Sequence, residues 1–232
     1  MIRFTLFGVP VGIHPSLWIT LALLGGGFHV ARFGDLLGVA LFVVAGFVCL
    51  LAHEMGHALV GRRLGGGHPE VHLAWLGGDC TNMDARLTRP QGIAMTAAGP
   101  LASLAVGVLA TLVLGVYVGS LKLGGMLALN FMWGQIPAEL LAGYPIMAIY
   151  FFVALIEISF WWTVLNLLPV FPLDGGQIMQ GLMRSPRQMH TISFSAAVVL
   201  ALFFLVLGVW LMSIFMGMLA VFNYRMLRQC PY

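Results

Sequence analysis

A histidine, a glutamate and a second histidine occur within five residues of an apolar stretch, which reads HEMGH at positions 53–57. On a helix, residues four apart lie on one face, with Cβ atoms about 5–6 Å apart. Both imidazoles can then bind one zinc ion, and Glu54 lies beside the metal as a general base. This composition gives about 0.004 chance matches to the pattern, and three ionisable groups in an apolar helix are costly unless they serve a site. The pattern predicts a zinc site with His53 and His57 as ligands.

A catalytic zinc ion needs a third protein ligand and one position open to water. The candidate is Asp174, in a segment that reads NLLPVFPLDGG at 166–176 and in which two prolines end a helix. The topology argued below puts this segment on the same side of the membrane as His57, so the carboxylate lies at the depth of the histidines. The alternative is that Asp174 is only a turn residue before two glycines.

The overall composition indicates a membrane protein. Hydrophobic residues make up 60% of the 232 residues, charged residues make up 8%, and the mean hydropathy is +0.98. Soluble domains carry about 25% charged residues, so a water-soluble globule is excluded. The eleven basic residues form no patch larger than two neighbours, so we expect topology signals and no nucleic-acid partner. The three cysteines show no C-x-x-C spacing, which argues against a disulfide scaffold and a thiolate metal site.

Apolar runs of about 20 residues, the length that crosses a hydrocarbon layer of ~30 Å, predict the transmembrane helices. We expect an all-α polytopic membrane protein with one domain over residues 1–232 and about six spans, at 15–31, 36–60, 92–118, 146–168, 191–207 and 209–224. A cytoplasmic N-terminus then leaves nine basic residues inside and two outside, whereas a single-span tail gives seven against four. The positive-inside rule favours six spans, a helix break near Gly208 or Met212, and both termini in the cytoplasm.

The segment between the second and third spans contains a short β-pattern. Residues 71–76 read VHLAWL and are bounded by glycines, which predicts a strand or hairpin on the cytoplasmic side. An unwound substrate backbone could pair with its edge, and Leu76, Gly77 and Gly78 are the predicted substrate-binding residues because glycines let another backbone approach. The alternative is a hairpin that merely connects two helices.

Three other features are less specific. The segment 121–144 is predicted to be interfacial or re-entrant, with Trp133 and Tyr144 at the membrane interface. Glu157 lies in the middle of a span, where a carboxylate is paired, protonated or part of a water path. Cys49, one turn before His53, is interpreted as a small buried hydrophobic residue and not as a ligand.

HEMGH at 53–57 and NLLPVFPLDG at 166–175 resemble the paired signatures of the site-2 protease family of intramembrane zinc metalloproteases. The run FGVPVGIHPS at 7–16, the Leu-Gly-Gly at 76–78 and the AGPL at 98–101 are also similar to compact members of that family. The resemblance therefore extends over nearly the whole chain. It implies cleavage of transmembrane segments near the cytoplasmic face, as in regulated intramembrane proteolysis, with one Zn²⁺ per chain.

The resemblance also implies roles for single residues. It makes His53, His57 and Asp174 the zinc ligands, Glu54 the catalytic base, and Asn166 a polar group near the scissile carbonyl. It further implies three core helices that hold the zinc and other helices that gate access, in a multi-pass protein of the prokaryotic cell membrane. The expected partners are a transmembrane protein or peptide substrate and the lipid bilayer. We expect a compact member without a peptide-binding or nucleotide-sensing appendage, in which regulation would need a separate protein.

One departure from the family pattern and two rival functions remain open. Ser103 stands where many members have asparagine, which puts a hydrogen-bonding role there in doubt. A metal-binding transporter or sensor could use the same His, Glu and Asp cluster, but it should distribute ligands along the membrane depth and often shows repeats. An inactive family member is disfavoured because Glu54 is intact.

Overall fold

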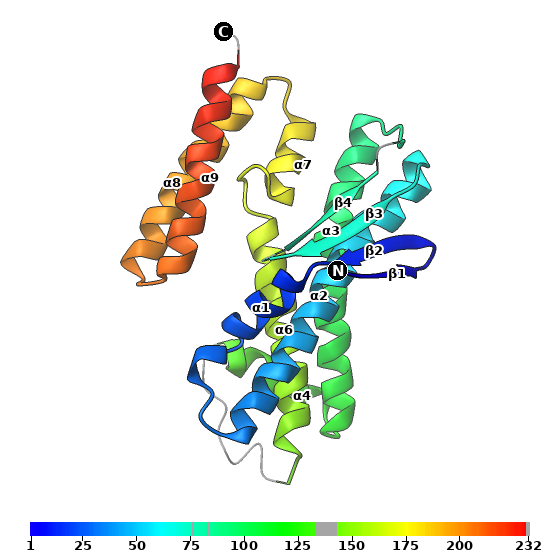
Figure 1. The fold of residues 1–232 in the computed structure, drawn as a ribbon, viewed down its shortest axis with the longest axis vertical. Helices are drawn as coiled ribbons and strands as arrows, with labels where there is room; N and C mark the ends of the chain where they lie inside the picture. The colour runs from blue at the N-terminus through cyan, green and yellow to red at the C-terminus, as the bar shows by residue number, and fades with distance from the viewer. Residues whose placement is uncertain (76, 83, 133–142, 231–232) are drawn as a thin grey trace.

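The computed structural model describes residues 1–75, 77–82, 84–132 and 143–230, in which long helices surround a small sheet (Figure 1). The helices are α1 (Pro15–Leu24), α2 (Phe33–Gly65), α3 (Arg89–Tyr117), α4 (Leu121–Met132), α6 (Ile146–Asn166), α7 (Asp174–Leu182), α8 (Pro186–Val206) and α9 (Trp210–Gln229). The strands are β1 (Ile2–Leu6), β2 (Val9–Ile13), β3 (Glu70–Ala74) and β4 (Gly77–Thr81). The predicted helical membrane fold with a short strand element is confirmed.

Five of the described helices are long and apolar enough to cross a membrane, namely α2, α3, α6, α8 and α9. The structure differs from the prediction at the first span, 15–31. Helix α1 has ten residues, which is about 15 Å and half of a ~30 Å hydrocarbon layer. Three glycines follow it, and Gly26 has a φ of 91°, so the chain leaves the helix there and forms a 3₁₀ turn at Gly27–His29.

The C-terminal tail forms two helices, as the charge count predicted. Helix α8 ends at Val206, Gly208 has a φ of 73°, and α9 begins at Trp210. Glycine at this position takes the left-handed conformation without the penalty that a Cβ would add. In the predicted interfacial segment, α4 is too short to span a bilayer, and Tyr144 donates a hydrogen bond to the Val118 carbonyl. Trp133 lies outside the described residues.

The four strands form one sheet in the order β1-β2-β3-β4. The predicted hairpin is β3 paired antiparallel with β4, while β2 pairs parallel with β3 and places Val11 opposite Val71. An N-terminal hairpin was not predicted from the sequence. Phe7 and Gly8 both have positive φ and join β1 to β2. This pairing puts the N-terminus beside the α2–α3 connection and leaves β4 as an edge strand.

Close helix packing fixes the distance between α2 and α3. A Cβ at Gly56 would overlap the Ala98 carbonyl oxygen and the Ala102 side chain, so these two helices approach nearly backbone to backbone. Helix α6 packs against both. Helices α8 and α9 stand to one side of this bundle (Figure 1). Their buried contacts, through Ala197 and Ala220, are with Val170 in the connection between α6 and α7.

Candidate metal centre

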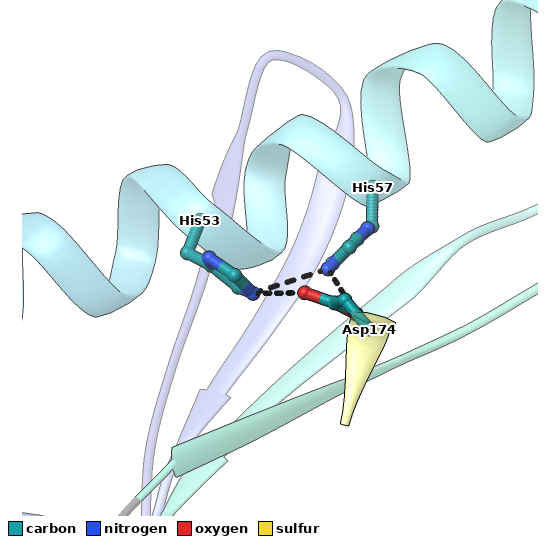
Figure 2. Close-up of side chains that lie close together, drawn as sticks. All are labelled: His53, His57 and Asp174. Atoms are coloured by element: carbon teal, nitrogen blue, oxygen red, sulfur yellow. Dashed lines mark hydrogen bonds and ion pairs between the residues drawn. The ribbon is translucent and has the colours of Figure 1, made fainter. Parts of the chain in front are cut away.

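Two histidines of α2 and one aspartate of α7 point toward a common centre (Figure 2). His53 and His57 lie one helical turn apart, and their Nε2 atoms are 3.2 Å from each other. Asp174 is the first residue of α7 and places Oδ2 3.0 Å from His53 Nε2 and Oδ1 3.4 Å from His57 Nε2. All three residues are buried. The structure therefore brings the three predicted ligands together although 117 positions separate His57 from Asp174.

The glycines that follow Asp174 explain how it reaches the histidines. A Cβ at Gly175 would overlap the carbonyl oxygen of Leu167, and a Cβ at Gly176 would overlap the backbone of Phe171. The chain after α6 therefore folds back closely on itself, which only glycine permits at these two positions. This fold-back places the start of α7 opposite the His53 and His57 side of α2 (Figure 2).

Hydrogen bonds on the far side of each imidazole set the ring tautomers. His57 Nδ1 lies 3.0 Å from the Met95 carbonyl oxygen, which only accepts, so Nδ1 carries the proton. His53 Nδ1 lies 2.9 Å from Ser103 Oγ, and Ser103 donates its own proton to the Gly99 carbonyl, so Nδ1 of His53 also donates. In the neutral rings both Nε2 atoms then carry a lone pair directed at Asp174.

This donor set fits a zinc ion. Two lone pairs and a carboxylate converge with no proton between them, and the buried Asp174 Oδ2 has no hydrogen-bond donor among the described residues. A cation relieves this repulsion. Tetrahedral zinc with ligand distances of about 2.0–2.1 Å requires donor atoms about 3.3 Å apart. The two Nε2 atoms are 3.2 Å apart, and each has a different Asp174 oxygen nearby, Oδ2 at 3.0 Å from His53 and Oδ1 at 3.4 Å from His57. His53, His57 and Asp174 would hold the ion.

Ser103 is a residue whose part in the site the sequence analysis left in doubt. It is fully buried and bonds to His53, so it orients the ring although it replaces the asparagine of the family pattern. Partners of this kind on the outer nitrogen of a metal-bound histidine change metal affinity by about 10–100-fold. The sequence could have indicated Ser103 by its spacing, because it lies four residues after Gly99 and therefore on the same face of α3. Helix α3 packs against α2.

Glu54 lies beside the cluster and against the sheet. Its side chain is buried, and a Cβ at Gly78 of β4 would overlap Glu54 Cγ. Glycine at position 78 thus makes room for the carboxylate, which is a different reason from the backbone access that the sequence suggested. Glu54 is close enough to interact electrostatically with His57 and Asp174. A carboxylate here can exchange a proton with a group bound at the centre.

The candidate metal ligands and Glu54 line a cavity of about 1120 Å³. Besides the three ligands and Glu54, its wall includes Asn166 at the end of α6, and Gly77 and Gly78 in β4. The Asn166 amide donates one hydrogen bond to the Trp162 carbonyl, at 3.0 Å. Leu76, the third predicted substrate-binding residue, lies outside the described residues. Apolar side chains of α1, α6, α8 and α9 form most of the remaining wall.

The cysteines near the site are not reactive groups. Cys80 lines the cavity from β4, and burial, with the Glu54 and Asp79 carboxylates nearby, raises the pKa of its thiol to about 12. The free thiol therefore stays protonated at neutral pH and is a poor nucleophile. Cys49 is buried in the core between α2, α3 and α6, as its interpretation as a small hydrophobic residue predicted.

A buried polar network ties the connection before Asp174 to α8 and α9. The Asn223 amide of α9 donates a hydrogen bond to the Phe171 carbonyl at 2.6 Å, and its oxygen accepts one from His190 Nδ1 of α8 at 3.0 Å. Phe171 N–H donates to Ser193 Oγ at 3.1 Å. These contacts fix the backbone three residues before the third ligand, so the α8–α9 pair helps to position Asp174.

Removing the Asp174 carboxylate should weaken zinc binding by about 100-fold or more, because two histidines alone fall short of the three protein ligands of a catalytic site. Competition with a chromophoric chelator measures the affinity of Asp174→Ala. Asp84→Ala removes an exposed carboxylate and is the matched control. Equal zinc affinity in the two variants would mean that Asp174 is only a turn residue.

Comparison with known proteins adds relatives of the chain. A Synechocystis protein named "Putative zinc metalloprotease" is 28% identical over 186 residues, which cover 77% of this chain and 42% of that protein. A zinc metalloprotease of Methanocaldococcus jannaschii is 23% identical over 228 residues, which cover 95% of this chain and 57% of that protein. The chain thus spans about half the length of these curated relatives.

A solved structure and a family model also match. The structure of the site-2 protease from Methanocaldococcus jannaschii aligns with a TM-score of 0.53 and 24% identity, covering 98% of this chain and 94% of that one. This likeness shows a shared fold. The model of peptidase family M50 matches residues 41–209, which include His53, His57 and Asp174. The chain therefore belongs to peptidase family M50.

Proposed function

We propose that the protein is a zinc-dependent endopeptidase that cleaves transmembrane segments of membrane proteins near the cytoplasmic face. One observation carries the proposal: two imidazole lone pairs and a carboxylate converge in a cavity between apolar helices, with Glu54 in the same wall. Membership of a peptidase family supports hydrolysis. The apolar wall favours a substrate segment that comes from the bilayer.

The chemistry divides between the metal and the chain. A zinc ion held by His53, His57 and Asp174 would supply Lewis-acid chemistry, which polarises a carbonyl and acidifies water. Glu54 would act as the general base that takes a proton from the attacking water and the general acid that returns it to the leaving amine. Asn166 has a second amide N–H beyond the one that bonds Trp162, and this group would donate to the scissile carbonyl oxygen. His53, His57 and Asp174 leave one coordination position open.

The substrate should bind as an extended strand, because a peptide bond within a helix has its carbonyl hydrogen-bonded and an unwound backbone in lipid needs new partners. Within the predicted partner segment, strand β3 (Glu70–Ala74) has no free edge, because it lies between β2 and β4. The edge beside the cavity is β4, and Gly77, Gly78, Asp79 and Cys80 line the wall. We therefore assign backbone pairing to β4.

The location follows from the spans and the charge count. We place the protein in a prokaryotic cell membrane with both termini and the sheet in the cytoplasm. Helix α1 is not a full span, but it runs from the sheet toward the start of α2, since Leu21 contacts Gly46 and Gly25 contacts Phe42. The N-terminal hairpin thus stays on the side of Arg62 and Arg63. Lipid and the substrate are the expected partners, and regulation would come from a separate protein.

A metal transporter or sensor is the competing function. It would need further ligands along a path through the membrane. Among the described residues, His53, His57 and Asp174 form the only group of three or more such side chains close enough to hold a metal. The single cluster beside Glu54 favours the peptidase.

Cleavage by the purified protein tests the proposal. In lipid vesicles, the protein should cut a labelled transmembrane peptide, lose this activity to a zinc chelator and regain it when zinc is restored. Mass spectrometry should place the cut near the cytoplasmic end of the segment. Zinc transport into the vesicles without cleavage of any peptide would favour the transporter instead.

Disulfide trapping tests the strand pairing. Asp79→Cys is introduced at the exposed β4 position after the native cysteines are replaced by alanine, and a peptide carries one cysteine at successive positions. Trapping should peak at every second peptide position, because side chains of a strand alternate between two faces. Glu70→Cys, on β3, is the control and should trap little. A period near 3.6 would mean that the bound segment is still helical.

A further inference from the structure

Glu157 is a carboxylate in the membrane-spanning part of the cavity wall. The cavity-lining residues of α6 include Glu157, Trp161 and Leu165, which are four apart and share one helix face. Ile158, Trp162 and Asn166 form the neighbouring row of the same face. Glu157 therefore belongs to the cavity surface that also carries the metal centre.

The protein supplies no cation for Glu157 among the described residues. The cavity wall contains four acidic residues, Glu54, Asp79, Glu157 and Asp174, and no lysine or arginine. Glu54 and Asp174 are already assigned to the metal centre. No hydrogen bond or ion pair joins Glu157 to another described side chain, and Tyr150 is the titratable neighbour whose electrostatic environment it affects. Carboxylates in a bilayer are costly and commonly pair or mark a substrate path.

The depth of Glu157 can be placed relative to the metal centre. The Trp162 and His53 rings are in contact, with centroids 6.1 Å apart. Glu157 precedes Trp162 by five residues and Asn166 by nine, which is about 7.5 and 13.5 Å along α6. An extended substrate rises about 3.3 Å per residue, so these distances correspond to roughly two to four substrate residues from the scissile bond, away from the sheet.

We infer that Glu157 forms a subsite for a basic side chain of the substrate's transmembrane segment, two to four residues to the non-cytoplasmic side of the cut. This inference rests on the proposed function and names a class of substrate for it. A lysine or arginine within a transmembrane segment lacks a partner in lipid, and Glu157 offers the counter-charge in an otherwise apolar part of the cavity. Burial of the pair in the same cavity strengthens the attraction.

The test compares peptides that differ at one position. Lysine, methionine or glutamate is placed at each of the second to eighth residues beyond the cut, and kcat/KM is measured with zinc-loaded protein. Lysine should exceed methionine by about tenfold at one position. Glu157→Gln should bring that ratio to about 1, and Glu157→Lys should reverse it in favour of glutamate. Glu70→Gln, an exposed carboxylate on β3, should keep the wild-type ratio.

Binding separates this inference from the peptidase proposal. Affinities of the same peptides are measured with Glu54→Gln protein, alone and combined with Glu157→Gln, so that no cleavage is needed. Tighter binding of the lysine peptide that disappears with Glu157→Gln supports the subsite even if no peptide is ever cut. Equal loss of cleavage for all peptides in Glu157→Gln would indicate a water path and overturn the inference, as would an unchanged lysine preference.

Discussion

Glu54→Gln should lower the rate of peptide cleavage by about 10³-fold while zinc stays bound, since general acid-base catalysis contributes about 10²–10⁴-fold. The amide has nearly the same shape as the carboxylate, so it fits beside Gly78, but it cannot accept a proton from water. His53 and His57 keep their outer hydrogen bonds to Ser103 and the Met95 carbonyl. The affinity for zinc should therefore change little.

The experiment pairs single-turnover cleavage with elemental analysis of the same preparation. Glu70→Gln changes an exposed carboxylate on β3 in the same way and should cleave at the wild-type rate. If Glu54→Gln cleaved as fast as the wild type with zinc bound, Glu54 would not be the base. If it lost zinc, the carboxylate would instead be a ligand, and the three-ligand assignment would need revision.

Gly99→Ala should disrupt the metal centre by adding a single methyl group. The added Cβ would overlap the His57 ring, including Nε2, and it would grow from a helix that already touches α2 at Gly56. Neither the ring nor the helix can move away without breaking the ligand geometry. Zinc affinity should fall by at least about 100-fold, as for the loss of a ligand's support, and cleavage should fall with it.

Gly92→Ala is the matched control for this substitution. Gly92 lies on the same helix, α3, and a Cβ there would meet nothing within 4 Å. The change should leave zinc binding intact and stabilise the helix by up to about 1 kcal/mol, because alanine is the better helix former. Chelator competition and thermal unfolding measure both effects. Equal zinc affinity in the two variants would show that α3 can shift at position 99.

The clustering of His53, His57 and Asp174 could be predicted from helix spacing and from membrane topology. His53 and His57 are related by one helical turn, which sequence spacing gives directly. Asp174 lies 117 positions after His57, but the membrane reduces the search to groups at one depth on one side. Sequence spacing could not predict the hydrogen bonds to the outer nitrogen atoms of the two imidazoles. Ser103 and the Met95 carbonyl reach the rings only because α2 and α3 pack closely.

The N-terminal region shows the opposite case. Residues 2–13 form two strands of a sheet whose next strand, β3, begins at Glu70. Parallel pairing between Val11 and Val71 joins segments that are 60 positions apart. A local sequence pattern therefore does not predict it. The same sheet makes β3 an interior strand and leaves β4, which contains the predicted Gly77 and Gly78, as the edge. The predicted span 15–31 was too long, because mean hydropathy counts the apolar residues after Leu24. It does not register that the glycines there allow the chain to leave the helix.

The glycines around the metal centre also limit which ion can bind there. The two Nε2 atoms are 3.2 Å apart, and each lies 3.0 to 3.4 Å from one oxygen of Asp174. Close contacts at Gly56, Gly99, Gly175 and Gly176 leave the backbones that carry these groups little room to move apart. Calcium, with bonds of about 2.3–2.6 Å and a preference for six or more oxygen atoms, would need a wider set of donors. Magnesium requires octahedral oxygen ligands that two imidazoles do not provide. Ion radius and donor type together disfavour calcium and magnesium at this centre.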